Sequence, residues 1–297
     1  NRRSGAMGGC QSSRPALVMS GTSEGICTIK CAGGQSYHCD FAGATLPHRG
    51  KDQDRFGMQF SANGLAVGIF DGHSLSHNIK QGIQHAENAC THLIADVWSR
   101  AKAPLAALGS DGALTPEVTR AVEASYTAHQ ERMMRRYQRE VADAMLAEKL
   151  RIEKEAGLEE GELPFELPQE GGTTATLLVL HEGGVLASWV GDSRAVAGVQ
   201  EEGGELRAEA LTVDHNVHDA AELARIQQAG GSTAAAKGED AGKLAEMVCV
   251  GGVEGTLKVT RSLGDSPFHK DDIVSHVPGL THRRRSTARR KGSVPVG

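Results

Sequence analysis

The stretch Leu65-Ala-Val-Gly-Ile-Phe-Asp-Gly-His73 is an apolar, β-prone run that ends abruptly in an acid, a glycine and a histidine. A second β-prone run, residues 54–60, precedes it, and Ser61-Ala-Asn-Gly64 separates the two. Asn-Gly between two hydrophobic runs predicts an antiparallel hairpin. Asp54 and Asp71 lie at nearly equal distances before and after the turn, so strand pairing brings both carboxylates to the same end of the hairpin.

Two carboxylates that lie side by side repel each other, and proteins relieve this cost with a shared proton or a bound cation. Oxygen ligands of this kind favour Mg²⁺ or Mn²⁺. The competing interpretation is simpler, because Asp-Gly is most often a turn dipeptide that closes a strand. The hairpin alone favours the turn, so the rest of the chain has to decide between the two.

Length and composition are those of a globular protein. The chain has 297 residues, 39% hydrophobic and 23% charged, which is enough for a full core in one large domain or two small ones. The formal net charge of -5 excludes a polyanion binder by charge alone. The sequence has no run of 18 apolar residues, so we expect no membrane span. The first residue is Asn rather than Met, which leaves open whether the chain is a fragment.

The six cysteines are spread irregularly along the chain. This pattern favours free thiols in a reducing compartment, so we expect an intracellular protein, cytoplasmic or nuclear. None of the cysteines is followed six positions later by arginine, so the phosphate-binding loop of thiol-dependent phosphatases is absent. A zinc site built on Cys27, Cys31, His38 and Cys39 is the weaker alternative, because their spacing matches no common zinc pattern.

Apolar residues at helical spacing predict the helices. Residues 78–103 form a helix that covers the sheet, and a link that contains Pro and Gly follows over 103–114. Thr115 is a good N-cap before Pro116, and a long charged helical segment is predicted over 118–157. Its later half is expected to be a solvated extension or a hairpin of helices.

The remaining elements are predicted from short apolar runs and from turn residues. Residues 1–40 are expected to be a loose lead-in with one strand near 25–30. Further along we expect a loop at 158–171, a second hairpin at 172–180 and 185–194 that ends in Gly191-Asp192, a helix at 220–229, and a strand at 254–265 that again ends in Gly-Asp.

Arg49 lies in a polar segment just ahead of Asp54. An arginine there could bind a phosphate through two hydrogen bonds beside the acidic pair. A solvated loop arginine is an equally good interpretation of the sequence alone.

Five motifs follow one another along the chain: Arg49 with Gln53-Asp54-Arg55, Val67-Gly-Ile-Phe-Asp-Gly-His73, Gly172-Thr-Thr-Ala with Val190-Gly-Asp-Ser-Arg-Ala195, Leu211-Thr-Val-Asp-His215 with Arg225-Ile-Gln-Gln-Ala-Gly-Gly231, and Leu257-Lys-Val-Thr-Arg-Ser-Leu-Gly-Asp265. In this order and spacing they resemble the metal-dependent Ser/Thr protein phosphatases, the PPM or type 2C family. Each motif is weak alone, but five in order are specific. The resemblance implies an α+β fold, a four-layer α-β-β-α sandwich of two antiparallel sheets flanked by helices.

The resemblance also implies a protein serine/threonine phosphatase, in which two Mn²⁺ or Mg²⁺ ions activate a water for in-line attack on phosphorus. By this resemblance the metal ligands are Asp71, the Gly72 carbonyl and Asp265, and Asp54 holds water at the metals. Arg49 would grip the phosphate, and His73 would be the general acid for the leaving oxygen. A plain strand-end histidine is the alternative for His73.

Several features depart from the family or stay open. The resemblance suggests that Asp192 supports an additional, weaker metal. Position 53 is Gln where many members carry Glu, and Ser74 stands where Gly is usual. We expect a lead-in at 1–40, a phosphatase domain at 41–280 with a helical insertion at about 118–170, and a basic tail at 281–297.

After Asp265 the chain has no late Asp-Gly motif, so we expect the domain to be incomplete at its C-terminal end. The alternative function is therefore a catalytically impaired, phosphatase-like protein that binds phosphoproteins or another partner. The expected partners are phosphoserine and phosphothreonine proteins, bound by a monomer. The weakest interpretation is a zinc or nucleic-acid module, built on the early cysteines and the arginine-rich tail.

Overall fold

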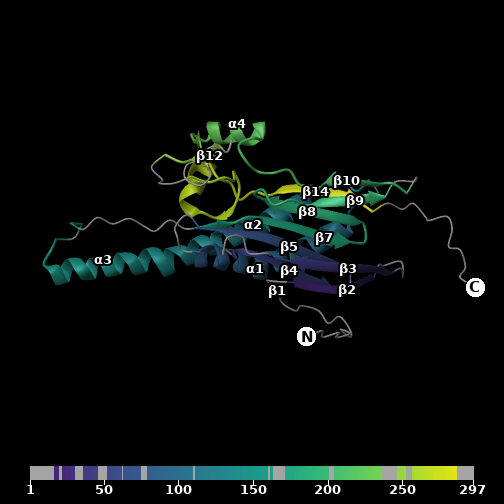
Figure 1. The fold of residues 1–297 in the computed structure, drawn as a ribbon, viewed down its shortest axis with the longest axis horizontal. Coiled ribbons are helices and arrows are strands. Elements are labelled where there is room, and N and C mark those ends of the chain that lie inside the picture. Colours follow the sequence, from purple (N-terminus) through teal and green to yellow (C-terminus); the bar gives the residue numbers. More distant parts are fainter. Residues whose placement is uncertain are drawn as a thin grey trace, which may run out of the picture.

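The computed structural model describes residues 17–19, 22–30, 36–45, 52–61, 63–74, 79–109, 111–159, 161–162, 171–200, 204–235, 246–251 and 256–285. Its centre is an antiparallel main sheet (Figure 1). In spatial order the main sheet contains β1 (Leu17–Met19), β4 (Asp54–Ser61), β5 (Gly64–His73), β7 (Ala175–His181), β8 (Gly184–Val190) and β14 (Gly279–Arg284). The short strand β6 (Gly172–Thr173) pairs with the end of β5 and with β13 (Leu263–Gly264). Because of these two pairings, one end of the main sheet contains two additional short strands, β6 and β13.

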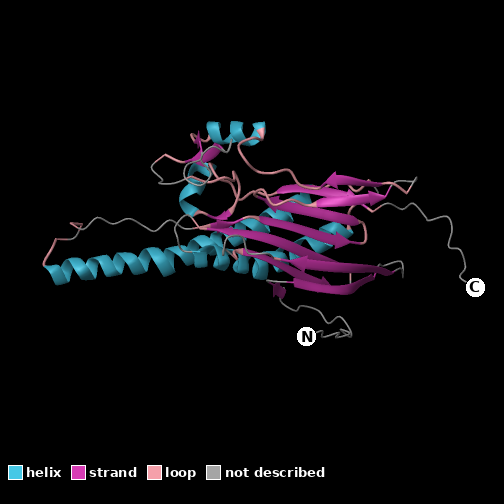
Figure 2. Cartoon of the chain, viewed as in Figure 1, coloured by secondary structure: helices cyan, strands magenta, loops and turns pink. Residues whose placement is uncertain are grey.

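Two helices, α1 (Ile79–Ala106) and α2 (Pro116–Tyr137), cover one face of the main sheet (Figure 2). Strand residues alternate between the two faces, and those of one face form the main core with the helices, among them Phe70, Leu177 and Leu186. The buried Tyr126 of α2 donates a hydrogen bond from its hydroxyl to Ser188 Oγ of β8 (3.2 Å). The helices are therefore fixed to the sheet by apolar packing and by at least one paired polar contact.

The opposite face of the main sheet packs against short β-hairpins. The hairpin of β2 (Thr22–Lys30) and β3 (Ser36–Ala44) contributes Phe41 to a cluster with Phe56 and Leu65. The hairpin of β9 (Val196–Gln200) and β10 (Leu206–Ala210) packs beside Ala187 of β8. Antiparallel sheets stacked in layers, with helices outside them, confirm the α+β sandwich class.

A smaller cluster of buried residues lies beside one end of the main sheet. It combines α4 (Ala220–Gln228), the 3₁₀ segment η3 (Ser266–Asp272), and a sheet of β11 (Ser232–Ala235) and β12 (Glu246–Cys249). Asp219 is the N-cap of α4, since its side chain accepts hydrogen bonds from the backbone N–H groups of Ala221 and Glu222. The predicted helix at 220–229 is confirmed.

The long charged segment is continuous with α2. Thr115 Oγ1 accepts from the Val118 N–H at the N-terminus of α2, as predicted. A π-helical turn, η1 (Gln138–Ala142), then leads into α3 (Asp143–Ala156). In Figure 1, α3 projects beyond the sheet as an extension, so of the two predicted forms the structure has the solvated extension rather than a hairpin of helices.

Four expectations need correction. The stretch 1–40 was expected to hold one strand near 25–30; β2 confirms that strand, but β1 and the start of β3 also lie there. Helix α1 continues through Pro104 to Ala106, beyond the predicted end at 103. The expected basic tail from 281 begins instead as β14, whose residues pair with β8 over Gly279–Arg284. The domain boundaries themselves stay predictions.

The fourth correction concerns the expected strand at 254–265. Within the described part of this stretch, residues 256–265, only β13 is a strand, because the preceding residues pair one at a time with different partners. The isolated bridges join Leu257 to Val248, Val259 to Asn216 and Arg261 to Ser275. An extended chain that changes partner at every second residue cannot form a continuous ladder.

Candidate active site at the acidic end of the main sheet

The β4–β5 hairpin has the predicted register. Asp54 lies directly opposite Asp71, and Ser61 lies opposite Gly64 at the turn. Because directly opposed residues of an antiparallel pair share one face, both carboxylates belong to the same face and the same end of the ladder. We call this end of the main sheet, with Asp54, Asp71, His73, Asp192 and Asp265, the acidic end.

Strand β6 brings Asp265 to the hairpin. Gly172 of β6 lies opposite His73 of β5 on one side and opposite Gly264 of β13 on the other. His73 Nε2 donates to Asp265 Oδ2 over 2.7 Å. A Cβ atom at Gly172 would collide with the Asp265 carboxylate, so only glycine at this position lets that carboxylate approach the histidine.

Asp265 is held in an unusual way. It is fully buried, and its backbone adopts the left-handed conformation with φ of 47°, which is uncommon for a residue other than glycine. Its Oδ2 atom also accepts a hydrogen bond from Ser262 Oγ (2.6 Å), whereas Oδ1 is buried with no hydrogen-bond partner. A buried carboxylate oxygen without a partner is costly, and it leaves one ligand atom available at this site.

Like charges at the acidic end alter the protonation of Asp71. Burial and the opposed Asp54 carboxylate raise the pKa of Asp71 from 3.8 to about 6, while His73 acts in the opposite direction. Asp192 contributes a smaller upward effect on this pKa. The repulsion that the sequence predicts between Asp54 and Asp71 is therefore present in the structure, and a proton or a cation would relieve it.

His73 responds to the same carboxylates with the opposite sign. Burial is the largest single influence and lowers the pKa of His73, but the charge and the hydrogen bond of the Asp265 carboxylate, added to the charges of two further carboxylates, raise this pKa by more, so the net pKa lies above its ordinary value. Asp71 and Asp192 also raise this pKa. His73 keeps a proton more readily than an ordinary histidine does, which suits a general acid.

The second hairpin supports the same end of the sheet. Thr174, between β6 and β7, accepts from the Asp71 backbone N–H (3.1 Å) and shares a hydrogen bond with Ser193 (2.8 Å). Ser193 follows Asp192, so these bonds tie the loop after β8 to the strand that carries Asp71. Sequence reasoning missed Thr174 and Ser262, because single hydroxyl residues carry no pattern of their own.

Two departures from the family contact each other. Gln53 Nε2 donates to Ser74 Oγ (3.3 Å), and Ser74 Oγ also accepts from the Gly82 backbone N–H at the start of α1 (3.1 Å). The amide at position 53 and the hydroxyl at position 74 therefore act together to join β4, β5 and α1.

The donor set fits hard divalent cations in part. Carboxylate and carbonyl oxygens are the ligands that Mg²⁺ and Mn²⁺ prefer, and Asp265 Oδ1 has an open position. Within the described ranges, however, no group of three or more His, Cys, Asp or Glu side chains is arranged to hold a metal ion. Asp265 Oδ2 is occupied by His73 and Ser262, so a cation would bind at Oδ1.

Two of the residues predicted for a site have no described position. Arg49 and Cys31 lie outside the described residues. Cys27 lies opposite Cys39 in the β2–β3 hairpin. Cys39, Cys90 and Cys249 are free thiols, as predicted for them.

Comparison with known proteins agrees with the fold and identifies the family. The protein phosphatase 2C family model matches residues 67–290. The chain therefore belongs to the protein phosphatase 2C family.

Individual relatives match shorter parts. "Probable protein phosphatase 2C 12" of Oryza sativa subsp. japonica is 33% identical over 113 residues, which are 38% of this chain and 28% of that protein. "Protein phosphatase 2C homolog 1" of Saccharomyces cerevisiae is 34% identical over 119 residues, 40% of this chain and 34% of that protein. The matched part of this chain thus spans about a third or less of either relative.

Among solved structures, the serine-threonine phosphatase 2C from Toxoplasma gondii is similar with a TM-score of 0.62 and 18% sequence identity. The alignment covers 93% of this chain and 79% of that one. At this identity the similarity supports the fold alone. No helix in the described part of the chain is long and apolar enough to cross a membrane.

Proposed function

We propose that this chain is a protein serine/threonine phosphatase that hydrolyses phosphoester bonds at the acidic end of the main sheet with two Mn²⁺ or Mg²⁺ ions. The observation that carries the proposal is the register of Asp54 with Asp71, next to His73 and Asp265, in a chain of the protein phosphatase 2C family. Phosphoserine and phosphothreonine proteins are the proposed substrates, and the monomeric state stays a prediction.

Three groups would hold the ions, the carboxylates of Asp71 and Asp265 and the Gly72 carbonyl, and the Asp54 carboxylate would hold water at this metal site. When bound, the ions would supply positive charge that activates water and offsets the charge of the phosphoryl group. Asp265 suits this role because Oδ1 has no partner while Oδ2 stays bonded to His73 and Ser262.

His73 would donate the proton that the reaction requires. The attacking water gives up one proton to solvent, and as its oxygen bonds to phosphorus, the bond from phosphorus to the serine or threonine oxygen breaks. That oxygen takes a proton from the imidazolium of His73, which solvent then restores. The Asp265 carboxylate keeps the imidazole oriented and protonated beforehand. Arg49 would hold the phosphate oxygens, and Asp192 would support an additional, weaker ion.

The test measures phosphate release from a phosphothreonine peptide with Mn²⁺ or with a chelator. Asp71→Ala should lower the rate at least about 100-fold, because even the loss of groups that only support metal ligands costs about 10–100-fold. Asp143→Ala is the matched control, since Asp143 lies exposed on α3 away from the sheet.

Equal rates for the wild-type and Asp71→Ala proteins, or full activity in the chelator, would contradict the proposal. Binding of the phosphopeptide without Mn²⁺-dependent hydrolysis would instead support the phosphatase-like binding protein.

A further inference from the structure

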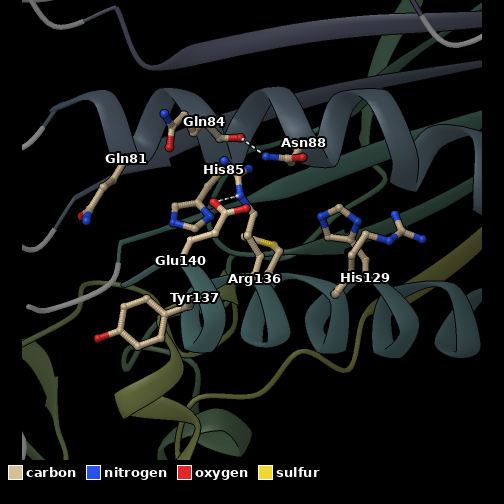
Figure 3. A pocket seen from close by; sticks show the side chains of 10 residues that line it. Gln81, Gln84, His85, Asn88, His129, Arg136, Tyr137 and Glu140 are labelled. Atoms are coloured by element: carbon tan, nitrogen blue, oxygen red, sulfur yellow. Dashed lines mark hydrogen bonds and ion pairs between the residues drawn. The ribbon is translucent and has the colours of Figure 1, made fainter. Parts of the chain in front are cut away.

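The contact between α1 and α2 changes character along its length. In its apolar part, residues such as Leu93 and Val97 of α1 pack with Val122 and Tyr126 of α2. Nearer the acidic end the facing residues are polar and enclose a cavity of about 240 Å³ (Figure 3). We call this cavity the helix groove. Helix α1 contributes Gln81, Gln84, His85 and Asn88; α2 and η1 contribute His129, Arg132, Met133, Arg136, Tyr137 and Glu140.

The residues of the helix groove come from one face of each helix. Those of α1 recur at steps of three and four, and those of α2 do the same before they continue into η1. This is the spacing by which packed helices present a core stripe. Polar side chains occupy positions that would normally be filled by apolar ones, so the groove is a feature of the helix interface.

Unpaired polar atoms are concentrated in the groove. Both ring nitrogens of His129, Gln81 Oε1 and Arg132 Nη1 are buried without a hydrogen-bond partner. These four belong to a set of twelve such atoms in the part of the chain that the structure describes. His129 itself is 0% exposed. Buried polar groups are nearly always paired, so this concentration indicates a missing hydrogen-bonding partner in the groove.

The open hydrogen-bond donors of the groove select the kind of ligand. Arg132 Nη2 binds Asp96 (3.1 Å) and Arg136 Nε binds Glu140 (2.8 Å), which leaves Arg132 Nη1 as an open cationic donor. Burial, with help from Arg132, lowers the pKa of His129 to about 3, so its imidazole is neutral. Each arginine is already paired with a carboxylate, so hydrogen bonding selects the ligand: an oxyanion would accept from Arg132 Nη1 and from the N–H of the neutral His129.

The apolar side chains define the rest of the ligand. Met133 and Tyr137 line the same cavity, and binding pockets commonly combine apolar walls with a few polar groups that fix orientation. Figure 3 shows the His129 ring at one side of the groove and Tyr137 at the other. The groove is thus suited to a molecule with one charged end and one apolar end.

We propose that the helix groove is a second ligand site, which binds a small organic oxyanion, a carboxylate or phosphoryl group on an apolar body, through Arg132 and His129. The site is separate from the acidic end. It is nevertheless close to it through α2, because Gln130 next to His129 exchanges two hydrogen bonds with the backbone of Gly264 (2.9 and 2.8 Å), the residue before Asp265.

Calorimetric titration of the full chain in a chelator tests the proposal with three probes: phenylphosphonate, benzoate and inorganic phosphate. We expect one of the two aromatic probes to bind more tightly than inorganic phosphate, and the tighter of them identifies the preferred oxyanion. Arg132→Met should weaken that binding at least about tenfold, since hydrogen bonds to charged groups are the strong ones. Arg135→Met is the matched control, because Arg135 lies on the same helix but does not line the groove.

The His129→Leu variant distinguishes a ligand site from a helix interface that is merely poorly packed. This variant keeps the volume of the side chain but removes both unpaired nitrogens, so probe binding should be lost while the melting temperature rises by about 2–4 °C. Asp71→Asn should leave probe binding unchanged.

Three outcomes would overturn the proposal. These are no binding of any probe to the wild-type chain, binding that survives in both Arg132→Met and His129→Leu, and binding that is lost in Asp71→Asn. None of them depends on phosphatase activity, so a failure here is distinct from a failure of the proposed function.

Discussion

Each end of the main sheet brings two side chains of the same kind together. The two carboxylates at one end repel each other, whereas the two imidazoles at the other end form a hydrogen bond. At the acidic end Asp54 faces Asp71, and the pKa of Asp71 rises to about 6. At the other end His181 of β7 faces His282 of β14, with 3.0 Å between their Nε2 atoms. We call this second place the histidine end.

The hydrogen bonds of the histidine end assign its protons. His282 Nδ1 donates to the Gly112 carbonyl (2.7 Å), so its Nε2 is the acceptor. His181 Nε2 then donates to it, and His181 Nδ1 accepts from the Gly183 N–H (3.2 Å). Every ring nitrogen of the two histidines is paired. Burial and the neighbouring His282 lower the pKa of His181 to about 4.

This difference separates a structural contact from a ligand site. At the histidine end, every ring nitrogen forms a hydrogen bond with another group of the chain. The acidic end retains repelling carboxylates and an unpaired oxygen at Asp265, so it gains stability only when a proton or a cation arrives. The predictions below address this difference, from the largest expected effect to the smallest.

Metal should stabilise the protein through the acidic end alone. At a Mn²⁺ concentration 100 times its dissociation constant, linkage gives about 2.7 kcal/mol of added stability. Chemical denaturation in Mn²⁺ and in chelator measures this gain. Asp71→Ala should abolish it, because Asp71 is a proposed ligand, and His181→Leu should preserve it.

A gain of equal size in Asp71→Ala would place the bound metal elsewhere in the molecule. Loss of the gain in His181→Leu would show that the two ends are not independent.

Acid should destabilise the protein in part through the histidine end. The pKa of His181 is about 4 in the folded state and 6.5 ordinarily, so between these values the unfolded chain binds the additional proton. Stability from this group is fully present above pH 6.5 and is lost as the pH falls toward 4, by up to about 1.4 kcal/mol per pH unit.

Denaturation of the wild-type and His181→Leu proteins at several pH values between 7.5 and 4.5 measures the effect. The variant should have the shallower dependence, and the difference between the two curves removes the contribution of the other buried histidines. Parallel curves would contradict the assignment.

Removing one negative charge should stabilise the acidic end without metal. The folded-state pKa of Asp71 exceeds its ordinary value, so stability from this group is lost as the pH rises through about 6. Asp71→Asn should therefore raise the stability of the metal-free protein at pH 7.5. Because the side chain reaches solvent, screening limits the gain to about 1 kcal/mol.

Denaturation in chelator compares Asp71→Asn with Asp143→Asn, which changes the same charge on exposed α3 and should have no effect. An unchanged or lower stability for Asp71→Asn would mean that the opposed carboxylates do not repel each other appreciably.

Local sequence patterns were sufficient for the hairpin and its register. Asn-Gly fixes the turn between β4 and β5, and equal arm lengths place Asp54 opposite Asp71. The Thr115 cap is predictable for the same reason, because capping and turn formation depend on neighbours in the sequence. The five motifs in order also predict the family.

Contacts between distant segments were predicted less well. The stretch that leads to Asp265 reads as a strand, since Leu257, Val259 and Arg261 alternate, but each pairs with a different partner. The arginines of β14 belong to the stretch predicted as a basic tail, although they complete the edge of the main sheet beside β8. Alternation and charge describe which face a residue prefers; they do not identify the strand that will lie beside it.

The sequence by itself determined the class of fold, the acidic pair and the residue types of the site, because these depend on local propensity and on motif order. Only the tertiary structure decided that Gly172 would let the Asp265 carboxylate reach His73, that Ser262 would bind the same carboxylate, and that polar groups of α1 and α2 would face one another unpaired. These features arise where segments far apart in the chain are packed within hydrogen-bonding distance, and burial there sets the cost of every unpaired polar atom.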